Sequence, residues 1–188
     1  MDKLLVILDL DETLVHATSR PKFPGWDFEL FSYKVFRRPG LDAFLGALPE
    51  HFRVAVWSSA SDDYVAKVVE TIFPAGYPLE FVWGRSRCTR RIDYYAMEEA
   101  GYLDYSDHLF FIKPLKKVKK QGLGHLERML IVDDTPFKCQ KNYGNAIYPA
   151  PFTGDPADDE LSHLLPYLIG LKDIPNVRTV EKRGWRNH

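Results

Sequence analysis

Three apolar runs of the sequence end in polar side chains, which are Asp9 and Asp11, Ser58 and Ser59, and Asp133 and Asp134. A single aspartate in such a position is commonly a turn or helix-capping residue. Four carboxylates gathered in one cleft would repel one another strongly, unless they took up protons or held a hard cation. Mg²⁺ prefers oxygen ligands and readily accepts a substrate phosphate as one of them. These residues therefore favour a magnesium-dependent site for phosphate chemistry.

The spacing of Asp9 and Asp11 suits covalent catalysis. Residues two apart on an extended chain point to the same side, so both carboxylates face one crevice if the chain stays extended past Leu10. One carboxylate can then attack phosphorus and form an aspartyl-phosphate. The other can handle the proton of the leaving group.

Continuous apolar runs are typical of fully buried parallel strands. Three strong runs span residues 3–8, 53–57 and 129–132, and weaker strand candidates span 80–83, 108–112 and 145–148. Helical spacing of apolar residues predicts helices that begin at Pro39, at Ser61, at residue 91 and at Asp158. In the last of these helices, Pro166 should introduce a kink or split it into two short turns.

The alternation of strands and helices predicts an α/β fold, with a Rossmann-like, mostly parallel sheet covered by helices on both faces. Ligands bind beyond the carboxyl ends of the strands in such sheets, which is where the acids and serines lie. No repeat or linker interrupts the sequence, so we expect one domain over residues 1–188. An aromatic-rich segment at about 17–37 should form a small hairpin or flap.

The composition is that of a soluble globular domain, with 45% apolar and 27% charged residues among 188. A net charge of −1 gives no general reason to expect nucleic-acid binding, and nothing indicates an oligomeric state. Cys88 and Cys139 are expected to be reduced thiols. The apolar run Leu4–Leu8 is too short for a signal peptide or a membrane span, so we expect a cytoplasmic protein without a membrane partner.

The segment Asp9–His16, DLDETLVH, resembles the first motif of haloacid-dehalogenase (HAD) superfamily phosphatases. It resembles in particular the capless branch that contains phosphatases of the RNA polymerase II carboxy-terminal domain, the NLI-interacting-factor-like phosphatases. Further segments resemble the later features of that branch, in order: Val56–Ser61, Phe111–Leu115, Ile131–Pro136 and Leu164–Leu168. The resemblance spans nearly the whole chain and implies a HAD-like fold and a HAD-type phosphomonoesterase.

The resemblance also implies a role for each matching residue at the reacting centre. Asp9 would be the nucleophile, and Asp11 would protonate the leaving oxygen and then deprotonate the attacking water. Mg²⁺ would be bound by the Asp9 carboxylate, the Asp11 backbone carbonyl and Asp133. Asp134 would bind it directly or through water, and the metal would stabilise charge on the phosphoryl oxygens.

Four further residues are implied in binding the phosphoryl group and the substrate. The Ser58 hydroxyl and the Ser59 N–H would hold a phosphoryl oxygen, and Lys113 would neutralise the phosphoryl group and hold Asp9. Lys113 differs from the lysines that follow it because it comes directly after an apolar strand, which would place it at the same sheet edge as the acids. Arg85 resembles an arginine that contacts substrate, although Arg87 is an equal candidate.

The sequence departs from the RNA-polymerase-directed enzymes at several positions. Pro114 follows the lysine where an acid is usual, and Asp134 stands where many relatives have Asn. The segment before Pro39 is short, whereas the corresponding insertion in those enzymes helps to recognise a peptide. The departures leave the catalytic residues intact but weaken the case for the same peptide substrate.

The absence of a stretch long enough for a large cap domain favours an open site that admits a protein loop. We therefore expect a phosphoprotein substrate, phosphorylated on Ser/Thr or Tyr, and keep a small-molecule or nucleic-acid-end phosphate as the alternative. A dehalogenase would share the nucleophile but would need neither Asp11 nor a metal cluster. A non-catalytic binding scaffold on the same fold is the alternative outside enzymes, and the full set of site residues argues against it.

Overall fold

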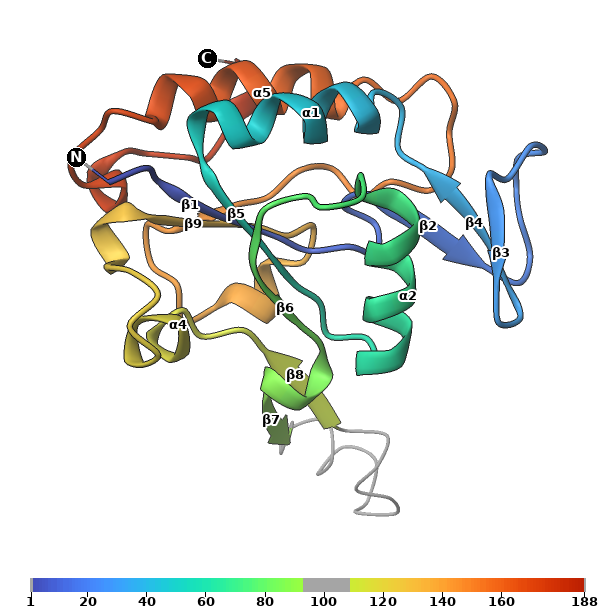
Figure 1. Cartoon of the computed structure of the whole chain (residues 1–188), viewed down its shortest axis with the longest axis horizontal. Helices are drawn as coiled ribbons and strands as arrows, with labels where there is room; N and C mark the ends of the chain where they lie inside the picture. The colour runs from blue at the N-terminus through green and yellow to red at the C-terminus, as the bar shows by residue number, and fades with distance from the viewer. Residues whose placement is uncertain (1, 93–108, 188) are drawn as a thin grey trace.

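The computed structural model describes residues 2–92 and 109–187. Its centre is a five-stranded sheet in the order β10-β9-β1-β5-β6, in which every pair of neighbours is parallel (Figure 1). The strands are β1 Leu5–Leu8, β5 Arg53–Trp57, β6 Leu79–Trp83, β9 Met129–Val132 and β10 Ala146–Ile147. All three strong strand predictions and two of the weaker ones are found in this sheet, and the predicted α/β architecture is confirmed.

Alternate residues of the central strands face two separate apolar cores, which explains why these strands are continuous apolar runs. Val6 and Leu8 of β1 face one core, and Leu5 and Ile7 face the other. All four side chains are completely buried. A strand covered on both faces leaves no position for a polar residue until it reaches the edge of the sheet.

The two faces of the sheet are covered unequally by the helices described. The longer helices α1 Leu41–His51, α2 Asp62–Ile72 and α5 Glu160–Leu171 all contribute to the core that contains Val6 and Leu8. Figure 1 shows α1 and α5 running side by side over this face. The other face is covered by the short helix α4 Lys116–Lys120 through Val118, together with neighbouring loops. Residues 93–100 of the helix predicted from residue 91 lie outside the described residues.

Helix α5 continues through Pro166, so the predicted split into two short turns is wrong. A proline within a helix costs about 3 kcal/mol because it removes a hydrogen bond and crowds the preceding turn. Four leucines of α5 are buried in the core: Leu161, Leu164, Leu168 and Leu171. Burial of one leucine is worth about 1.5–3 kcal/mol, so their combined burial outweighs the proline.

The aromatic-rich segment after β1 forms a small antiparallel sheet in the order β2-β4-β3. Its strands are β2 Val15–Thr18, β3 Phe28–Leu30 and β4 Tyr33–Arg37. The hairpin of β3 and β4 projects beside the main sheet and presents exposed aromatic side chains such as Phe31. Strand β4 leads through Arg38 and Pro39 into α1.

The strand predicted at 108–112 forms as β8 Leu109–Ile112, but its predicted place in the main sheet is wrong. It pairs antiparallel with β7 Thr89–Ile92 in a separate two-stranded ribbon, which Figure 1 shows below the main sheet. An apolar run identifies a buried strand, but it does not identify the strand that pairs with it.

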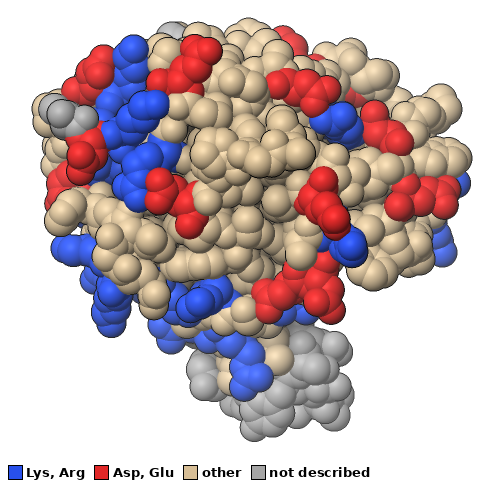
Figure 2. All heavy atoms as spheres, viewed as in Figure 1, with Lys and Arg blue, Asp and Glu red and all other residues tan. Residues whose placement is uncertain are grey.

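Charged side chains are unevenly distributed on the face shown in Figure 2. Lys and Arg gather around α4 and again near the N-terminus, where Asp and Glu lie among them, and a further group of Asp and Glu lies over the lower end of α2. Within the described ranges, no helix has the length and apolarity needed to cross a membrane.

Candidate active site

The ends of β1 and β9 set the position of two aspartates. Leu8 is in register with Val132, so the next residues, Asp9 and Asp133, leave the sheet at the same level and on the same face. Backbone hydrogen bonds continue the ladder beyond the strands. The Asp9 N–H donates to the Val132 carbonyl at 2.9 Å, and the Asp133 N–H donates to the Ile147 carbonyl at 3.1 Å. The carboxylates therefore project from a rigid backbone.

Lys113 joins these two aspartates in a buried ion-pair network. Its Nζ lies 2.8 Å from Asp9 Oδ1 and 2.7 Å from Asp133 Oδ2, and all three side chains are almost completely buried. Burial raises the pKa of Asp9, but the charges of Lys113 and Lys138 outweigh it and hold this pKa below its ordinary value. Asp9 therefore remains ionised, as the predicted role of a nucleophile would require.

Lys113 reaches the site from the β7–β8 ribbon rather than from the main sheet. Its N–H donates to the Lys138 carbonyl at 2.8 Å, and its own carbonyl accepts from the Asn142 amide at 2.8 Å. The Asn142 side-chain oxygen also accepts the Leu115 N–H at 2.9 Å. The sequence thus predicts the correct residue beside the acids, but for an incorrect reason.

Asp11 occupies a different environment from Asp9. Strand β1 ends at Leu8, Asp11 forms an isolated bridge with Val15, and the chain turns at Glu12, whose φ is 58°. The Asp11 carboxylate accepts a hydrogen bond of 2.6 Å from the Tyr64 hydroxyl. Burial raises the pKa of Asp11, the Tyr64 bond opposes this and the charge of Asp9 adds to it, so the pKa lies above its ordinary value. Two aspartates two residues apart thus have pKa values shifted in opposite directions.

Asp9, Asp133 and Asp134 form a group that fits a hard divalent cation. Each offers a carboxylate oxygen, and these oxygens lie within 4.8 Å of one another. Burial raises the pKa values of Asp133 and Asp134, and the charge of Asp9 adds to both shifts. The three carboxylates face two ammonium groups, Lys113 and Lys138, so negative charge is in excess at this site. Oxygen donors with an excess of negative charge are the set that Mg²⁺ prefers. The Asp11 carboxylate, bonded to Tyr64, is not one of the three.

Ser58, Ser59 and Arg85 lie at the end of β5 and in the turn after β6. Ser58 is buried, and its hydroxyl oxygen accepts the Ala60 N–H at 3.0 Å, which leaves its hydroxyl proton available for an anion. The Arg85 Nε donates to the Ser59 carbonyl at 2.8 Å. Arg85 lines a pocket of about 550 Å³ together with Asp11, whereas Arg87 lies over the Trp83 ring, 5.3 Å from its centre. Arg85 therefore shares this pocket with Asp11, and Arg87 is not among the residues that line it.

Sequence reasoning missed two residues of the site, Tyr64 and Lys138. Tyr64 occupies an apolar position of α2, and the one available signal was that a buried tyrosine hydroxyl needs a hydrogen-bond partner. Lys138 lies in the 3₁₀ turn Pro136–Cys139. Its Nζ is 3.4 Å from Asp9 Oδ2 and 4.0 Å from Asp134 Oδ1. The only signal for Lys138 was its proximity in sequence to the second acidic pair.

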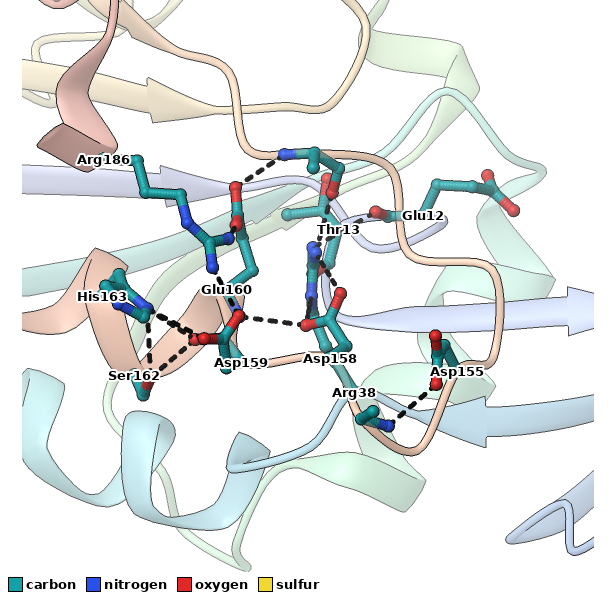
Figure 3. Close-up of polar contacts among 12 residues, drawn as sticks. Glu12, Thr13, Arg38, Asp155, Asp158, Asp159, Glu160, Ser162, His163 and Arg186 are labelled. Carbon is teal, nitrogen blue, oxygen red and sulfur yellow. Dashed lines mark hydrogen bonds and ion pairs between the residues drawn. The ribbon is translucent and has the colours of Figure 1, made fainter.

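A second buried charged group, the arginine node, consists of Arg38, Asp158 and the main-chain carbonyls that Arg38 contacts (Figure 3). The Arg38 guanidinium makes two hydrogen bonds of 2.8 Å to the Asp158 carboxylate. It also donates to the Ala150 carbonyl at 2.7 Å and to the Thr13 carbonyl at 3.1 Å. In turn, the Thr13 hydroxyl accepts the Asp134 N–H at 3.2 Å. The arginine node therefore fixes the backbone of Thr13, whose hydroxyl joins the loop after Asp11 to the loop of the second acidic pair.

The profile of the NLI interacting factor-like phosphatase family matches residues 4–178. The chain belongs to this family. The predicted enzyme class, a phosphatase among the hydrolases, is confirmed by this membership. The resemblance inferred from the motifs at Asp9 and Asp133 is likewise confirmed.

Named relatives are similar over almost all of this chain. Nuclear envelope morphology protein 1 of Saccharomyces cerevisiae is 26% identical over 95% of the chain and 41% of its own length. CTD nuclear envelope phosphatase 1 of Xenopus tropicalis is 27% identical over 98% of the chain and 73% of its own length. The mitochondrial import inner membrane translocase subunit TIM50 of Kluyveromyces lactis is 28% identical over 95% of the chain. The chain spans less than half the length of the first and third of these, 41% and 32%.

Two solved structures share the fold. The fission yeast RNA polymerase II CTD phosphatase Fcp1 has a TM-score of 0.55 at 18% identity, covering 93% of this chain and 52% of that one. A haloacid dehalogenase-like hydrolase from Bacteroides fragilis has a TM-score of 0.50 at 10% identity, covering 79% of this chain and 87% of that one. These similarities confirm the predicted HAD-like fold.

The prediction of a cytoplasmic protein is wrong. Relatives from budding yeast, fission yeast and Xenopus tropicalis are named for the nuclear envelope. The prediction rested on the short apolar run Leu4–Leu8, which includes β1 and is completely buried. A core strand reports how the domain folds and carries no information about where the protein is located.

Proposed function

We propose that this protein is a magnesium-dependent phosphatase that hydrolyses a phosphate monoester through an aspartyl-phosphate on Asp9. The observation that carries this proposal is the opposite shift of two neighbouring carboxyl groups. The pKa of Asp9 lies below its ordinary value and that of Asp11 lies above it. Pairs of titratable groups with divergent pKa values commonly divide into an ionised partner and an acid. Asp9 suits the nucleophile, and Asp11 suits the proton donor.

The reaction would proceed in two steps. An Asp9 oxygen bonds to phosphorus as the ester P–O bond breaks, and Asp11 gives its proton to the leaving oxygen. Water then attacks phosphorus, Asp11 takes up a proton from that water, and the bond to Asp9 breaks to release phosphate. Lys113 holds Asp9 in position throughout. The Ser58 hydroxyl and the Ser59 N–H would donate to the phosphoryl oxygens.

A bound Mg²⁺ would supply Lewis-acid stabilisation of the negative charge on the phosphoryl oxygens. The residues that would hold it are Asp9, through its carboxylate, Asp11, through its carbonyl, Asp133 and Asp134. The excess of negative charge among the three clustered carboxylates supports this assignment.

We propose a phosphoprotein as the substrate. The names of several relatives designate CTD phosphatases, and the pocket beside Asp11 is lined by Arg85, by Tyr64 and by aromatic residues of the β3–β4 hairpin. Such a mixed surface suits a phosphorylated side chain within a peptide, of Ser/Thr or Tyr. A small-molecule or nucleic-acid-end phosphate is the alternative substrate class.

A non-catalytic scaffold is the alternative function, and one observation favours it. The similar protein TIM50 of Kluyveromyces lactis is named as a translocase subunit and not as a phosphatase. Against it stand the buried Lys113, at 2.8 Å from Asp9, and the raised pKa of Asp11, because a scaffold has no need of either feature.

The test is hydrolysis of an aryl phosphate with and without Mg²⁺, in wild-type protein and in Asp9→Asn. We expect metal-dependent release of phosphate, lost on chelation and reduced at least about 10⁴-fold by Asp9→Asn, since loss of a covalent nucleophile removes the main route. Full turnover by Asp9→Asn would exclude the mechanism. Absence of turnover in wild-type protein, on aryl phosphate and on phosphopeptides, would favour the scaffold. Comparison of phosphoserine, phosphothreonine and phosphotyrosine peptides with metabolites and nucleotides would identify the substrate class.

A further inference from the structure

Two lysines lie on opposite oxygens of the nucleophile. Lys113 pairs with Asp9 Oδ1 at 2.8 Å, and Lys138 faces Asp9 Oδ2 at 3.4 Å. Lys113 is completely buried and is also held by Asp133 at 2.7 Å. The side chain of Lys138 is 22% exposed, and its second carboxylate, Asp134, is 4.0 Å away. One ammonium group is therefore fixed, whereas the other is loosely held at the edge of the site.

The loosely held ammonium contacts two of the three carboxylates that would bind the metal. Asp9 and Asp134 belong to the group whose oxygens lie within 4.8 Å of one another, and Lys138 approaches both. A magnesium ion binds carboxylate oxygens at about 2.1 Å and requires near-octahedral geometry, so it leaves little freedom in the direction of those oxygens. An ammonium group on the same oxygens would repel the metal and compete for their charge.

We propose that Lys138 competes with Mg²⁺ for Asp9 and Asp134 and thereby sets the metal concentration at which the site is filled. The proposal rests on the proposed function, because it concerns the metal site of that mechanism. Metal entry would require the ammonium group to leave the two carboxylates, and metal loss would allow it to return. Lys138 would thus weaken metal binding and stabilise the acidic residues between binding events.

The local structure allows this movement without a change of backbone. The Lys138 carbonyl accepts the Lys113 N–H at 2.8 Å, and the Lys138 N–H donates to the Thr135 carbonyl at 3.1 Å. These bonds fix the main chain of the turn. The side chain of Lys138 is partly exposed and can rotate into solvent. The side chain of Lys113 is buried and cannot make the same movement.

The test is direct measurement of metal affinity in Lys138→Met. Methionine keeps an unbranched side chain that is one atom shorter, and it removes the charge. Binding of Mg²⁺, measured by isothermal titration calorimetry, should therefore be about tenfold tighter, equivalent to about 1.4 kcal/mol. Electron paramagnetic resonance with Mn²⁺ should give the same ratio. Lys138→Arg keeps the charge and should leave the affinity near that of wild type. Lys141→Met is the matched control, because Lys141 is exposed and the change removes the same charge.

Thermal unfolding gives a second readout that does not depend on activity. In EDTA, Lys138→Met should unfold at a lower temperature than wild type, because its acidic residues lack a cation. Saturating Mg²⁺ should raise its unfolding temperature by more than it raises that of wild type, since tighter binding to the folded state stabilises it more. A variant too unstable to titrate would be replaced by Lys138→Gln.

The outcomes separate this inference from the proposed function. Equal Mg²⁺ affinity in wild type and Lys138→Met would overturn the competition. Unchanged metal affinity with weaker binding of inorganic phosphate or vanadate would also overturn it, and would assign Lys138 to the substrate. Metal binding by neither protein would overturn the proposed metal site itself.

Discussion

Two groups of buried charge among the described residues differ in how their charges are paired: the acid cluster of Asp9, Asp11, Asp133 and Asp134, and the arginine node of Arg38 and Asp158. In the arginine node, a single carboxylate meets a guanidinium through two hydrogen bonds, and carbonyl oxygens accept its remaining donors. In the acid cluster, Asp9, Asp133 and Asp134 share the ammonium groups of Lys113 and Lys138, and the Asp11 carboxylate is bonded to the Tyr64 hydroxyl. The first group is neutral and satisfied, whereas the second carries excess negative charge.

This difference separates a structural role from a chemical one. Burial of charge is unfavourable because the charged groups lose their hydration. In a fully bonded pair such as Arg38–Asp158, the attraction and hydrogen bonds between the two partners offset this loss. In the acid cluster, the nearby positive charges do not fully compensate the burial of the carboxylates, so the pKa values of Asp11, Asp133 and Asp134 are raised. A group that is destabilised in the folded protein can gain stability from a cation or a substrate, which a satisfied pair cannot do.

The largest expected effect is on stability, at the arginine node. Arg38→Met should lower the free energy of unfolding by about 3–5 kcal/mol, because Asp158 would be left as an unpaired, largely buried charge. Denaturation in urea would measure this loss. Arg37→Met is the matched control, since the partly exposed ion pair of Arg37 with Asp42 should contribute less than about 1 kcal/mol. An equal loss of stability in both variants would show that the buried Arg38–Asp158 pair contributes no more than the partly exposed Arg37–Asp42 pair.

The double variant Arg38→Met/Asp158→Asn sharpens this prediction. Asparagine keeps the side-chain oxygen that accepts the Glu160 N–H at the start of α5, and it removes the unpaired charge. Part of the stability lost in Arg38→Met should therefore return. Further loss in the double variant would mean that the charge of Asp158 is not the cause.

The next effect has the opposite sign and belongs to the acid cluster. Asp134→Asn should raise the free energy of unfolding in EDTA by about 1 kcal/mol at neutral pH, because it removes one of the excess charges. The pKa of Asp134 is higher in the folded state than in the unfolded state, so between these two pKa values the unfolded state binds fewer protons. The stability of the wild-type protein therefore falls as the pH rises through this range. The variant should lack that fall. Asp173→Asn, at an exposed position, is the control, and a destabilised Asp134→Asn protein would contradict the comparison.

The smallest effect concerns the hydrogen bond between Tyr64 and Asp11. This bond lowers the pKa of Asp11, so Tyr64→Phe should raise it. Because the proposed first step requires a protonated Asp11, the alkaline limb of kcat should move to higher pH. Tyr77→Phe removes a hydroxyl that donates to the Leu45 carbonyl, and it should not move the limb. A shift to lower pH in Tyr64→Phe would argue against Asp11 as the acid.

The sequence was most informative where residues follow buried strands. Asp9, Ser58 and Asp133 could be predicted because β1, β5 and β9 are continuous apolar runs with abrupt polar ends. The position of Lys113 beside the acids could be predicted, but the ribbon that carries it could not, because the pairing of β8 with β7 depends on contacts between distant segments. Periodicity reports which face of an element is buried, and it does not report the partner of that face.

Residues in turns and on helices were harder to predict. Lys138 reaches Asp9 because of the 3₁₀ turn and the hydrogen bond from Lys113, neither of which has a periodic signature. Tyr64 has the spacing of an apolar core residue of α2, which hid its bond to Asp11. The effect of Pro166 was overestimated because local propensity ignores the buried leucines of α5. Each of these depends on tertiary packing.

The register of the central strands has a consequence for engineering and for evolution. Leu8 is paired with both Val56 and Val132, so the register of the strands fixes the positions of Asp9 and Asp133 at the edge of the sheet. These positions can change only in steps of one whole residue along β1 or β9. Deleting one residue from β1 would turn Asp9 toward the opposite core, among the neighbours of Val6 and Leu8. Loops at the other end of the sheet can change length without moving Asp9. Natural or designed variants of this protein should therefore tolerate insertions and deletions in those loops. Within β1 and β9 they should tolerate substitutions but not insertions or deletions.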